Sequence, residues 1–219
     1  MAARRTVVIL LIALPLLSNV ISFVIFAPHF ASGQPDPTAL RSAGNQMSLT
    51  VGLLEWVAVA FVWWQLRKEG TSLGRLVNFQ PQRLRQYLQL GLVALLPTLL
   101  AGWLFVRTLA KTGALVSPGE MTTSEFLTWY LLVPLTAPLV EETIWRGFAL
   151  PRLRGYWRAI FWSSLSFALF HGIFSPTALL ATFLLGLVWG WLYQATKSTL
   201  PGMVLHFFSR YLALVPGFA

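Results

Sequence analysis

The chain contains no cysteine, and it has few charged residues. The absence of cysteine from its 219 residues excludes disulfides and thiol chemistry. Only 11% of the residues are charged, whereas 56% are hydrophobic, a balance outside the range of ordinary soluble domains. The composition therefore predicts a membrane protein.

Acidic residues are especially scarce. Seven aspartates and glutamates stand against sixteen lysines and arginines, so the formal net charge is +9. In a soluble protein this excess would suggest nucleic-acid binding, but basic residues also collect in the cytoplasmic loops of membrane proteins. We therefore expect no nucleic-acid partner, and the partner that the composition indicates is the lipid bilayer.

Long apolar runs dominate the chain. A helix rises 1.5 Å per residue, so about 20 apolar residues cross a hydrocarbon core of about 30 Å. The first run is too long for the apolar part of a signal peptide, and we interpret it as a retained helix. We expect an all-α, polytopic transmembrane helix bundle with about seven spans. The seven runs are 6–27, 48–65, 88–106, 126–140, 157–174, 176–195 and 200–218.

Basic residues alternate between the two ends of these runs. With a cytoplasmic N-terminus, twelve basic residues lie in the inner loops and only Arg41, Arg107 and Lys111 lie in the outer ones. This asymmetry predicts that the N-terminus is cytoplasmic. The inner loop 67–85 mixes apolar and basic residues, and we expect it to contact anionic lipid headgroups.

Several ionisable residues lie inside the apolar runs. A charged side chain at mid-membrane costs at least about 2.5 kcal/mol, so such residues face the bundle interior and mark functional sites. We assign no role to His29, which lies in an outer loop. The candidates are Glu55, Glu141, Glu142, His171, His206 and Arg210.

Two prolines precede the paired glutamates. Pro134 and Pro138 each remove a backbone hydrogen bond, so the helix should bend or loosen just before the carboxylates. Glu142 and Arg146 are spaced for a helical ion pair, which we interpret as structural, with a catalytic part as the alternative. Glu141 lies about 100° around the helix axis from Glu142 and has no local partner, which makes it the candidate general base.

The histidines lie on later runs. Ser164 and Ala168 place small side chains on the same helix face as His171, where a neighbouring helix can approach closely. Gly186 and Gly190 form a second face of this kind on the next run. Close helix packing is therefore expected around His171.

Three of the ionisable residues have matching depths. Counted from the nearest basic residues of the inner loops, Glu141, His171 and His206 each lie roughly 13 to 20 Å below the membrane surface. They can share one layer, and we predict a functional site there. Glu55 has no partner that the sequence identifies, and a structural or proton-handling role stands beside a catalytic one.

The motifs resemble those of the CPBP family, the CAAX-processing and bacteriocin-related intramembrane proteases, also called the Abi family. Glu141-Glu142-xxx-Arg146, then Phe167-xxx-His171, then His206 agree with it in order and spacing. The resemblance implies a catalytic core over 122–212, preceded by N-terminal transmembrane helices with a basic loop over 1–121. Together they would form one integrated membrane domain. The stretch after the first motif is also similar, with Gly147, Phe148, Leu150, Pro151, Arg152 and Leu153.

The resemblance implies an intramembrane endopeptidase. Glu141 and His171 would position and deprotonate a water, and His206 would help to stabilise the oxyanion. The supporting residues would be Glu142, Arg146, Phe167 and Arg210. The substrate would be a membrane-associated protein or peptide, and we expect a bacterial type of substrate and the bacterial inner membrane.

One position departs from the family pattern. The family usually has an asparagine four residues after the last histidine, where this chain has Arg210. An asparagine amide is a neutral donor suited to an oxyanion hole, whereas arginine is long and permanently charged. Arg210 would either strengthen oxyanion binding or bind a glutamate and close the site. The alternative is thus a catalytically inactive relative that acts in immunity or as a binding or regulatory partner.

Metal dependence is a further open point. Glu141, His171 and His206 could hold zinc and leave one coordination position open. However, the chain has no HExxH motif and its two histidines are 35 residues apart, so we favour a metal-free site without a cofactor. A proton or metal transporter that uses Glu55 is a weaker alternative, because transporters usually show internal repeats and this sequence shows none.

Overall fold

The computed structural model describes residues 2–30, 36–111, 121–171 and 175–212. Within these ranges the chain is helical and contains no strand, so the predicted all-α class is confirmed. The longer elements are α1 (Ala2–Phe30), α2 (Pro37–Lys68), α4 (Leu84–Lys111), α7 (Tyr156–Phe170), α8 (Pro176–Thr196) and α9 (Leu200–Leu212).

A kinked helical segment lies in the middle of the chain. It comprises α5 (Thr123–Phe126), η3 (Leu127–Leu132), α6 (Val133–Glu141), η4 (Glu142–Ala149) and η5 (Leu150–Arg152). Both η3 and η4 are π-helical, so wide turns flank the proline-containing α6 on both sides. The loosening predicted just before the glutamates is displaced, because Val133–Glu141 stays α-helical and the wide turns lie over Leu127–Leu132 and from Glu142 onward. Such π-turns occur frequently at functional sites.

Neighbouring helices replace some hydrogen bonds that the prolines remove. Pro134 has no N–H to donate to the carbonyl of Tyr130, and the hydroxyl of Tyr211 donates to this carbonyl at 3.2 Å. Pro15 likewise leaves the carbonyl of Leu11 free in α1, and the hydroxyl of Ser166 donates to it at 2.7 Å. At these two positions the freed carbonyl is satisfied inside the bundle, as a membrane requires.

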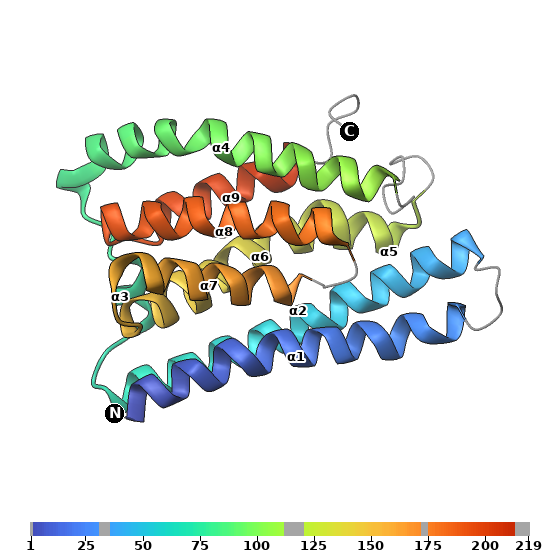
Figure 1. Cartoon of the computed structure of the whole chain (residues 1–219), viewed down its shortest axis with the longest axis horizontal. Helices are drawn as coiled ribbons and strands as arrows, with labels where there is room; N and C mark the ends of the chain where they lie inside the picture. Colours follow the sequence, from blue (N-terminus) through green and yellow to red (C-terminus); the bar gives the residue numbers. More distant parts are fainter. Residues whose placement is uncertain (1, 31–35, 112–120, 172–174, 213–219) are drawn as a thin grey trace.

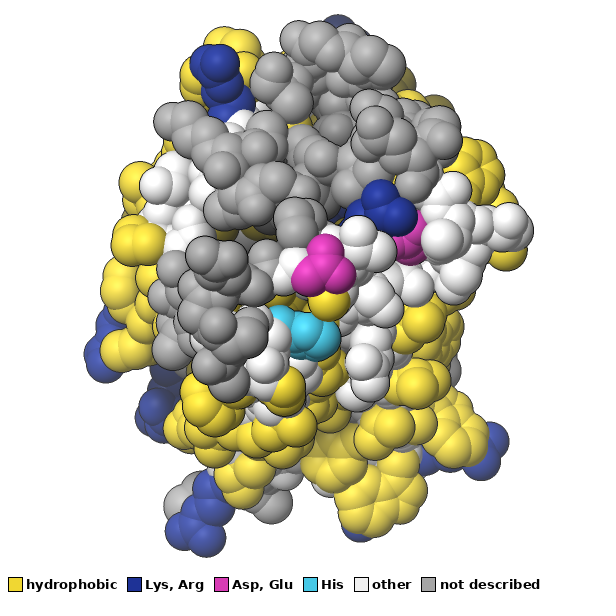
Figure 2. All heavy atoms as spheres, turned by 90° about the vertical axis from the view of Figure 1, so that its right-hand side faces the viewer, with side chains coloured by type: hydrophobic (Ala, Val, Ile, Leu, Met, Phe, Trp, Pro, Cys, Tyr) yellow, Lys and Arg dark blue, Asp and Glu magenta, His cyan; other side chains and the backbone are white. Residues whose placement is uncertain are grey.

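The helices form a bundle with the kinked segment inside it. The α1–α2 hairpin lies on one side and α4 on the other, with α6, α7, α8 and α9 between them (Figure 1). In this arrangement α8 contacts both α4 and α7, α1 contacts α7, and α6 contacts α9 and α2. Apolar side chains lie along the flanks of the end of the bundle shown in Figure 2, and many large ones are exposed, as expected of a surface that faces lipid.

Four helices in the described residues are long and apolar enough to cross a membrane. Their ranges are Arg4–Phe30, Thr38–Lys68, Leu73–Thr108, which combines α4 with the two short helices before it, and Pro176–Thr196. The other three predicted runs are also helical, but α7 has 15 residues and α9 has 13, and the kinked segment is divided by its π-turns. The ends of two predicted runs, 172–174 and 213–218, lie outside the described residues.

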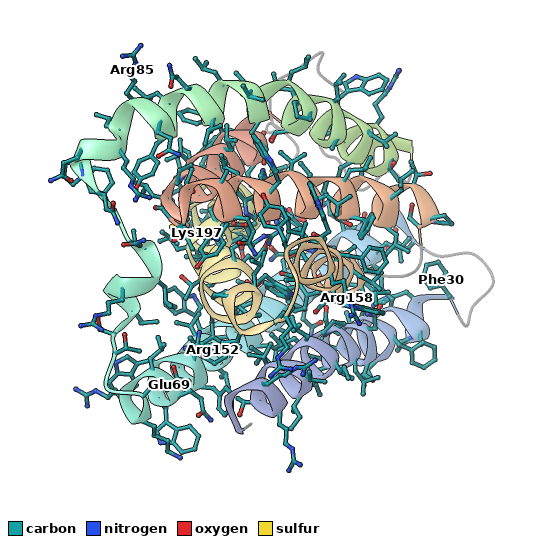
Figure 3. The ribbon with its side chains drawn as sticks, turned by 60° about the vertical axis from the view of Figure 1, so that its left-hand side comes forward. Phe30, Glu69, Arg85, Arg152, Arg158 and Lys197 are labelled. Atoms are coloured by element: carbon teal, nitrogen blue, oxygen red, sulfur yellow. The ribbon has the colours of Figure 1, made fainter. Side chains whose placement is uncertain are left out.

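Basic residues of the predicted inner loops gather at one end of the bundle, whereas Arg146, which was counted with them, is buried inside it. Arg85, Arg152 and Lys197 lie at the end where the chain begins, and Phe30 lies at the other (Figure 3). The short helix α3 (Leu73–Val77), followed by η1 (Pro81–Arg83), also lies at this end. Its Leu76 packs against Gly147, so the apolar part of the 67–85 loop contacts protein while its arginines stay exposed.

Close packing of α7 against α8 depends on glycine. A Cβ atom on Gly186 would lie 2.8 Å from the Cβ and 3.0 Å from the Cα of Ser164, closer than real Cβ contacts. A Cβ atom on Gly190 would lie 3.1 Å from the Cγ2 of Ile160. The small-residue packing face predicted around His171 is confirmed.

We expect Gly186→Ala to lower the unfolding free energy by about 1 to 3 kcal/mol, because the added methyl group forces α7 and α8 apart. Gly102→Ala in α4 is the matched control, since nothing lies within 4 Å of the position of its Cβ. That control should gain up to about 1 kcal/mol from helix propensity. Thermal unfolding of the detergent-solubilised proteins measures both; equal melting temperatures would contradict the packing argument.

Candidate active site

The structure brings the three predicted catalytic residues to one place from three separate elements. Glu141 ends α6, His171 follows α7 directly, and His206 lies in α9. The Oε2 atom of Glu141 lies 3.7 Å from Nε2 of His171 and 3.6 Å from Nε2 of His206. Glu141 and His206 are each only 2% exposed, so the carboxylate and imidazoles meet inside the protein.

His171 is held in a single tautomer. Its Nδ1 lies 2.9 Å from the carbonyl oxygen of Phe167, and a carbonyl only accepts, so the ring proton is on Nδ1. In the neutral ring, Nε2 is then an acceptor, and it faces Glu141. Two acceptors directed at one another suit a molecule that donates two protons, such as water.

Helix α1 anchors the end of α7 that carries His171. The hydroxyl of Ser18 donates to the carbonyl of Phe170 at 2.8 Å, and the side-chain amide of Asn19 donates to that of Leu169 at 2.7 Å. These carbonyls belong to the last turn of α7, where no intrahelical donor is available. The N-terminal region therefore helps to position His171.

His206 is fixed by an aromatic ring and by Arg210. Its ring stacks on Trp189 of α8, with the centroids 4.2 Å apart and the planes at 26°. The Nε–H group of Arg210 donates to Nε2 of His206 at 3.3 Å. The proton of neutral His206 is therefore on Nδ1, which lies 3.7 Å from Oε1 of Glu142.

Arg210 contacts all three candidate catalytic residues. Besides its bond to His206, its Nη2 lies 3.3 Å from Oε1 of Glu141 and 3.4 Å from Nε2 of His171. The arginine is thus bound to a glutamate, and its Nη2 is also a donor directed at the site.

The predicted ion pair of Glu142 and Arg146 is confirmed. Their side chains approach to 3.2 Å, and both residues are fully buried. The guanidinium also lies over the ring of Phe167 at 4.3 Å and donates to the carbonyl of Gly186 at 3.4 Å. One arginine thus joins the segment that carries both glutamates to α7 and α8.

The structure brings Glu55 to this centre. Glu55 comes from α2, is 5% exposed, and its carboxyl group interacts electrostatically with Glu141 and Arg210. Three carboxyl groups thus meet two guanidinium groups, those of Arg146 and Arg210.

Two further residues of the site were not predicted. Trp189 supports the ring of His206, and Gly202 lets α9 approach the carboxylate of Glu142, because a Cβ atom there would lie 2.8 Å from Oε2. The signal for Glu55 was its charge inside an apolar run. Trp189 and Gly202 carry no comparable signal, because aromatic residues and glycines are common in apolar helices.

The donor set does not suit a divalent cation. Among the residues that the structure describes, no group of three histidine or acidic side chains is arranged to hold a metal ion. The guanidinium of Arg210 contacts both Glu141 and His171, and its positive charge would repel a metal ion bound to the same atoms.

Residues 123–212 match the model of a family described as type II CAAX prenyl endopeptidase Rce1-like. The resemblance to the CAAX protease family is confirmed. The match begins next to the predicted boundary at residue 122 and includes all three motifs, whereas Glu55 lies outside it. No curated protein and no solved structure matches the chain.

At the level of the family, the match supports an intramembrane protease of the CAAX type. Such an enzyme acts on a membrane-associated protein substrate. The four apolar helices agree with an integral membrane protein.

We expect Glu142→Gln to lower the unfolding free energy by about 3 to 5 kcal/mol, because it leaves the buried guanidinium of Arg146 without its counter-charge. Glu69→Gln is the matched control, since it breaks a Glu–Arg pair with Arg152 at the protein surface and should cost at most about 1 kcal/mol. Thermal unfolding in detergent measures both, and a similar small loss for each would show that the buried pair is not structural.

Proposed function

We propose that the chain is an intramembrane endopeptidase in which Glu141 activates a water for attack on a peptide bond. The observation that carries the proposal is the convergence of Glu141, His171 and His206, within 3.7 Å of one another in the pairs that include Glu141. The match to the CAAX protease family supports it.

In this mechanism the water donates its two protons to Oε2 of Glu141 and Nε2 of His171. Its lone pair is then directed away from both acceptors and toward the carbonyl carbon of the substrate. As the oxygen–carbon bond forms, Glu141 takes one proton as the general base. It then passes this proton to the amide nitrogen as the carbon–nitrogen bond breaks, which releases the amine.

We propose Arg210 as the donor for the oxyanion of the tetrahedral intermediate. Because Nε2 of His206 accepts a hydrogen bond from Arg210, this nitrogen is not free to donate in the tautomer shown. His206 would therefore hold the guanidinium, and Nη2 of Arg210 would exchange its contacts with Glu141 and His171 for one with the oxyanion. A charged donor in a water-poor site stabilises such an anion strongly.

The proposed reaction needs no metal and no other cofactor, since a carboxylate base and a guanidinium donor supply proton transfer and charge stabilisation. For the substrate we propose a membrane-associated protein or peptide of a bacterial type, and for the location the bacterial inner membrane. The basic residues at one end of the bundle support a cytoplasmic N-terminus.

We expect Glu141→Gln to lower the rate of peptide cleavage by about 100- to 10,000-fold, because glutamine cannot accept the proton of the water. The measurement uses the full chain in proteoliposomes with a fluorogenic CAAX peptide, prenylated and unprenylated. Glu69→Gln serves as the control and should cleave like the original protein, as should the original protein treated with a chelator. Full activity of folded Glu141→Gln would refute the mechanism.

The contact of Arg210 with Glu141 also favours a second candidate function, a catalytically inactive family member in which the arginine closes the site. An inactive protein of this kind would serve as an immunity factor or a binding partner. The ion pair at 3.3 Å is the observation behind this alternative.

Replacing Arg210 separates the two functions. If the guanidinium binds the oxyanion, Arg210→Asn should lower the cleavage rate by about 10- to 1,000-fold, because a neutral amide stabilises the anion less. Arg210→Lys keeps the charge but lacks the planar guanidinium, so its cleavage rate should lie between those of the original protein and Arg210→Asn. If the arginine closes the site, the original protein should be inactive and Arg210→Asn should gain activity in the same assay.

A further inference from the structure

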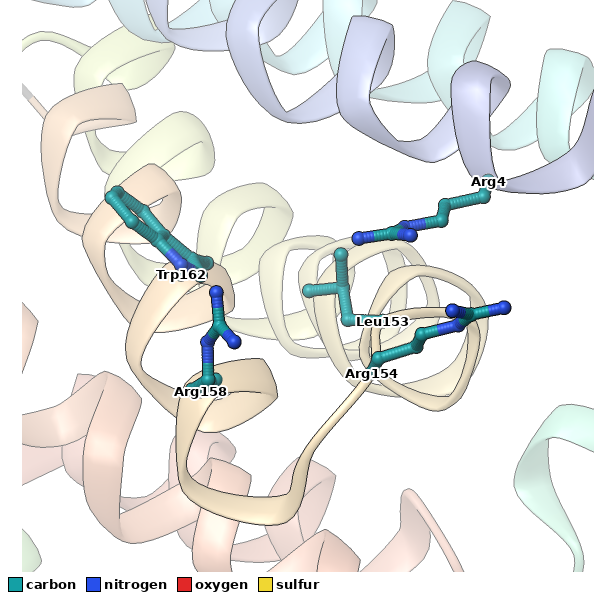
Figure 4. A pocket seen from close by; sticks show the side chains of 5 residues that line it. All are labelled: Arg4, Leu153, Arg154, Arg158 and Trp162. Atoms are coloured by element: carbon teal, nitrogen blue, oxygen red, sulfur yellow. The ribbon is translucent and has the colours of Figure 1, made fainter. Parts of the chain in front are cut away.

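A basic cavity lies away from the candidate active site, at the end of the bundle where the chain begins. Its volume is about 260 Å³, and it is lined by Arg4 of α1, by Leu153 and Arg154 after η5, and by Arg158 and Trp162 of α7. Figure 4 shows the three arginine side chains disposed around Leu153. The proposed proteolytic mechanism uses none of these residues.

The charge of this cavity is not balanced by protein. Three guanidinium groups line it together with one leucine and one tryptophan, so no carboxylate of the described residues is part of the wall. In the described part of the chain, none of these arginines forms an ion pair. Like charges held together favour an anion between them, and the planar fork of arginine matches the oxygens of a phosphate.

An apolar groove adjoins the basic cavity. Its volume is about 560 Å³, and it shares Arg158 and Trp162 with the cavity. The remaining wall consists of Trp157, Ile160, Phe161 and Leu187, from α7 and α8. Trp157 is 69% exposed and Trp162 is 52% exposed, as is typical of tryptophans at the boundary between headgroups and hydrocarbon.

We propose that the cavity and groove together bind one anionic phospholipid, with the phosphate on the arginines and an acyl chain along the groove. The basic cavity alone would also suit free phosphate, but free phosphate would leave the apolar groove unused. A zwitterionic lipid would bring a second, positive group toward the three arginines. Basic pockets between transmembrane helices are recognised binding sites for anionic headgroups.

The test is native mass spectrometry of the full chain released from micelles that contain phosphatidylglycerol and phosphatidylcholine in equal amounts. The original protein should retain phosphatidylglycerol in preference to phosphatidylcholine. Arg154→Gln combined with Arg158→Gln should weaken retention of phosphatidylglycerol by about 30-fold, from about fivefold for each arginine. Both arginines are exposed, so the double variant should fold, and its melting temperature verifies this.

The matched control is Arg83→Gln combined with Arg85→Gln, which removes the same charge from exposed arginines at the same end of the bundle, outside the cavity. It should change retention by less than about threefold if the site is specific. Equal losses in the two double variants, or equal retention of both lipids, would overturn the proposal. Displacement of the lipid by excess inorganic phosphate would also overturn it, because the site would then bind free phosphate.

If the double variant at Arg154 and Arg158 does not fold, Arg4→Gln replaces it. Arg4 lies near the beginning of α1, where its exposed side chain is not needed for packing. It should weaken retention of phosphatidylglycerol by about fivefold. Unchanged retention in folded Arg4→Gln would count against the site.

Discussion

The buried ion pair of Glu142 and Arg146 is the interaction on which the rest of the site depends. Both side chains are removed from solvent, so each charge would be very costly without the other. The same guanidinium contacts Phe167 of α7 and the backbone of α8, and the same carboxylate lies against Gly202 of α9. Four helical segments are thus held in register around one pair of charges.

Glu141 and its partners form a second group of buried polar and charged side chains, next to the ion pair of Glu142 and Arg146. Glu141 faces two imidazoles, a guanidinium and the carboxyl group of Glu55, and it has no fixed partner within its own helix. Glu142, in contrast, is paired with Arg146 one turn along the same helical segment. The adjacent glutamates therefore have different partners, because the helix turns them toward different sides.

Irregular backbone contributes to the different surroundings of Glu141 and Glu142. Pro134 and Pro138 interrupt the ordinary hydrogen-bond ladder, and π-turns flank the segment that carries them. The hydroxyl of Tyr211 replaces one lost hydrogen bond. Helix α9 therefore supplies residues to the site and also stabilises the segment that carries Tyr130. Irregular backbone inside a membrane is tolerated where protein covers it, and here the cover is the element that carries His206 and Arg210.

Much of this arrangement was predictable from local properties of the sequence. Hydropathy along the chain determined the all-helical class and the positions of the long helices, because the cost of burying each residue in lipid is approximately additive. The depth of Glu141, His171 and His206 followed from the helical rise, and the pairing of Glu142 with Arg146 followed from their spacing. Small residues near His171 determined where two helices approach each other.

Only the tertiary structure decided which faces of distant helices meet. The approach of Glu55 to Glu141, the stacking of Trp189 on His206 and the contact of Arg210 with three site residues all depend on how each helix is rotated about its axis. That rotation results from packing among all the helices at once, and no single run of sequence contains it. For the same reason, the sequence did not predict that three arginines lie together beside an apolar groove.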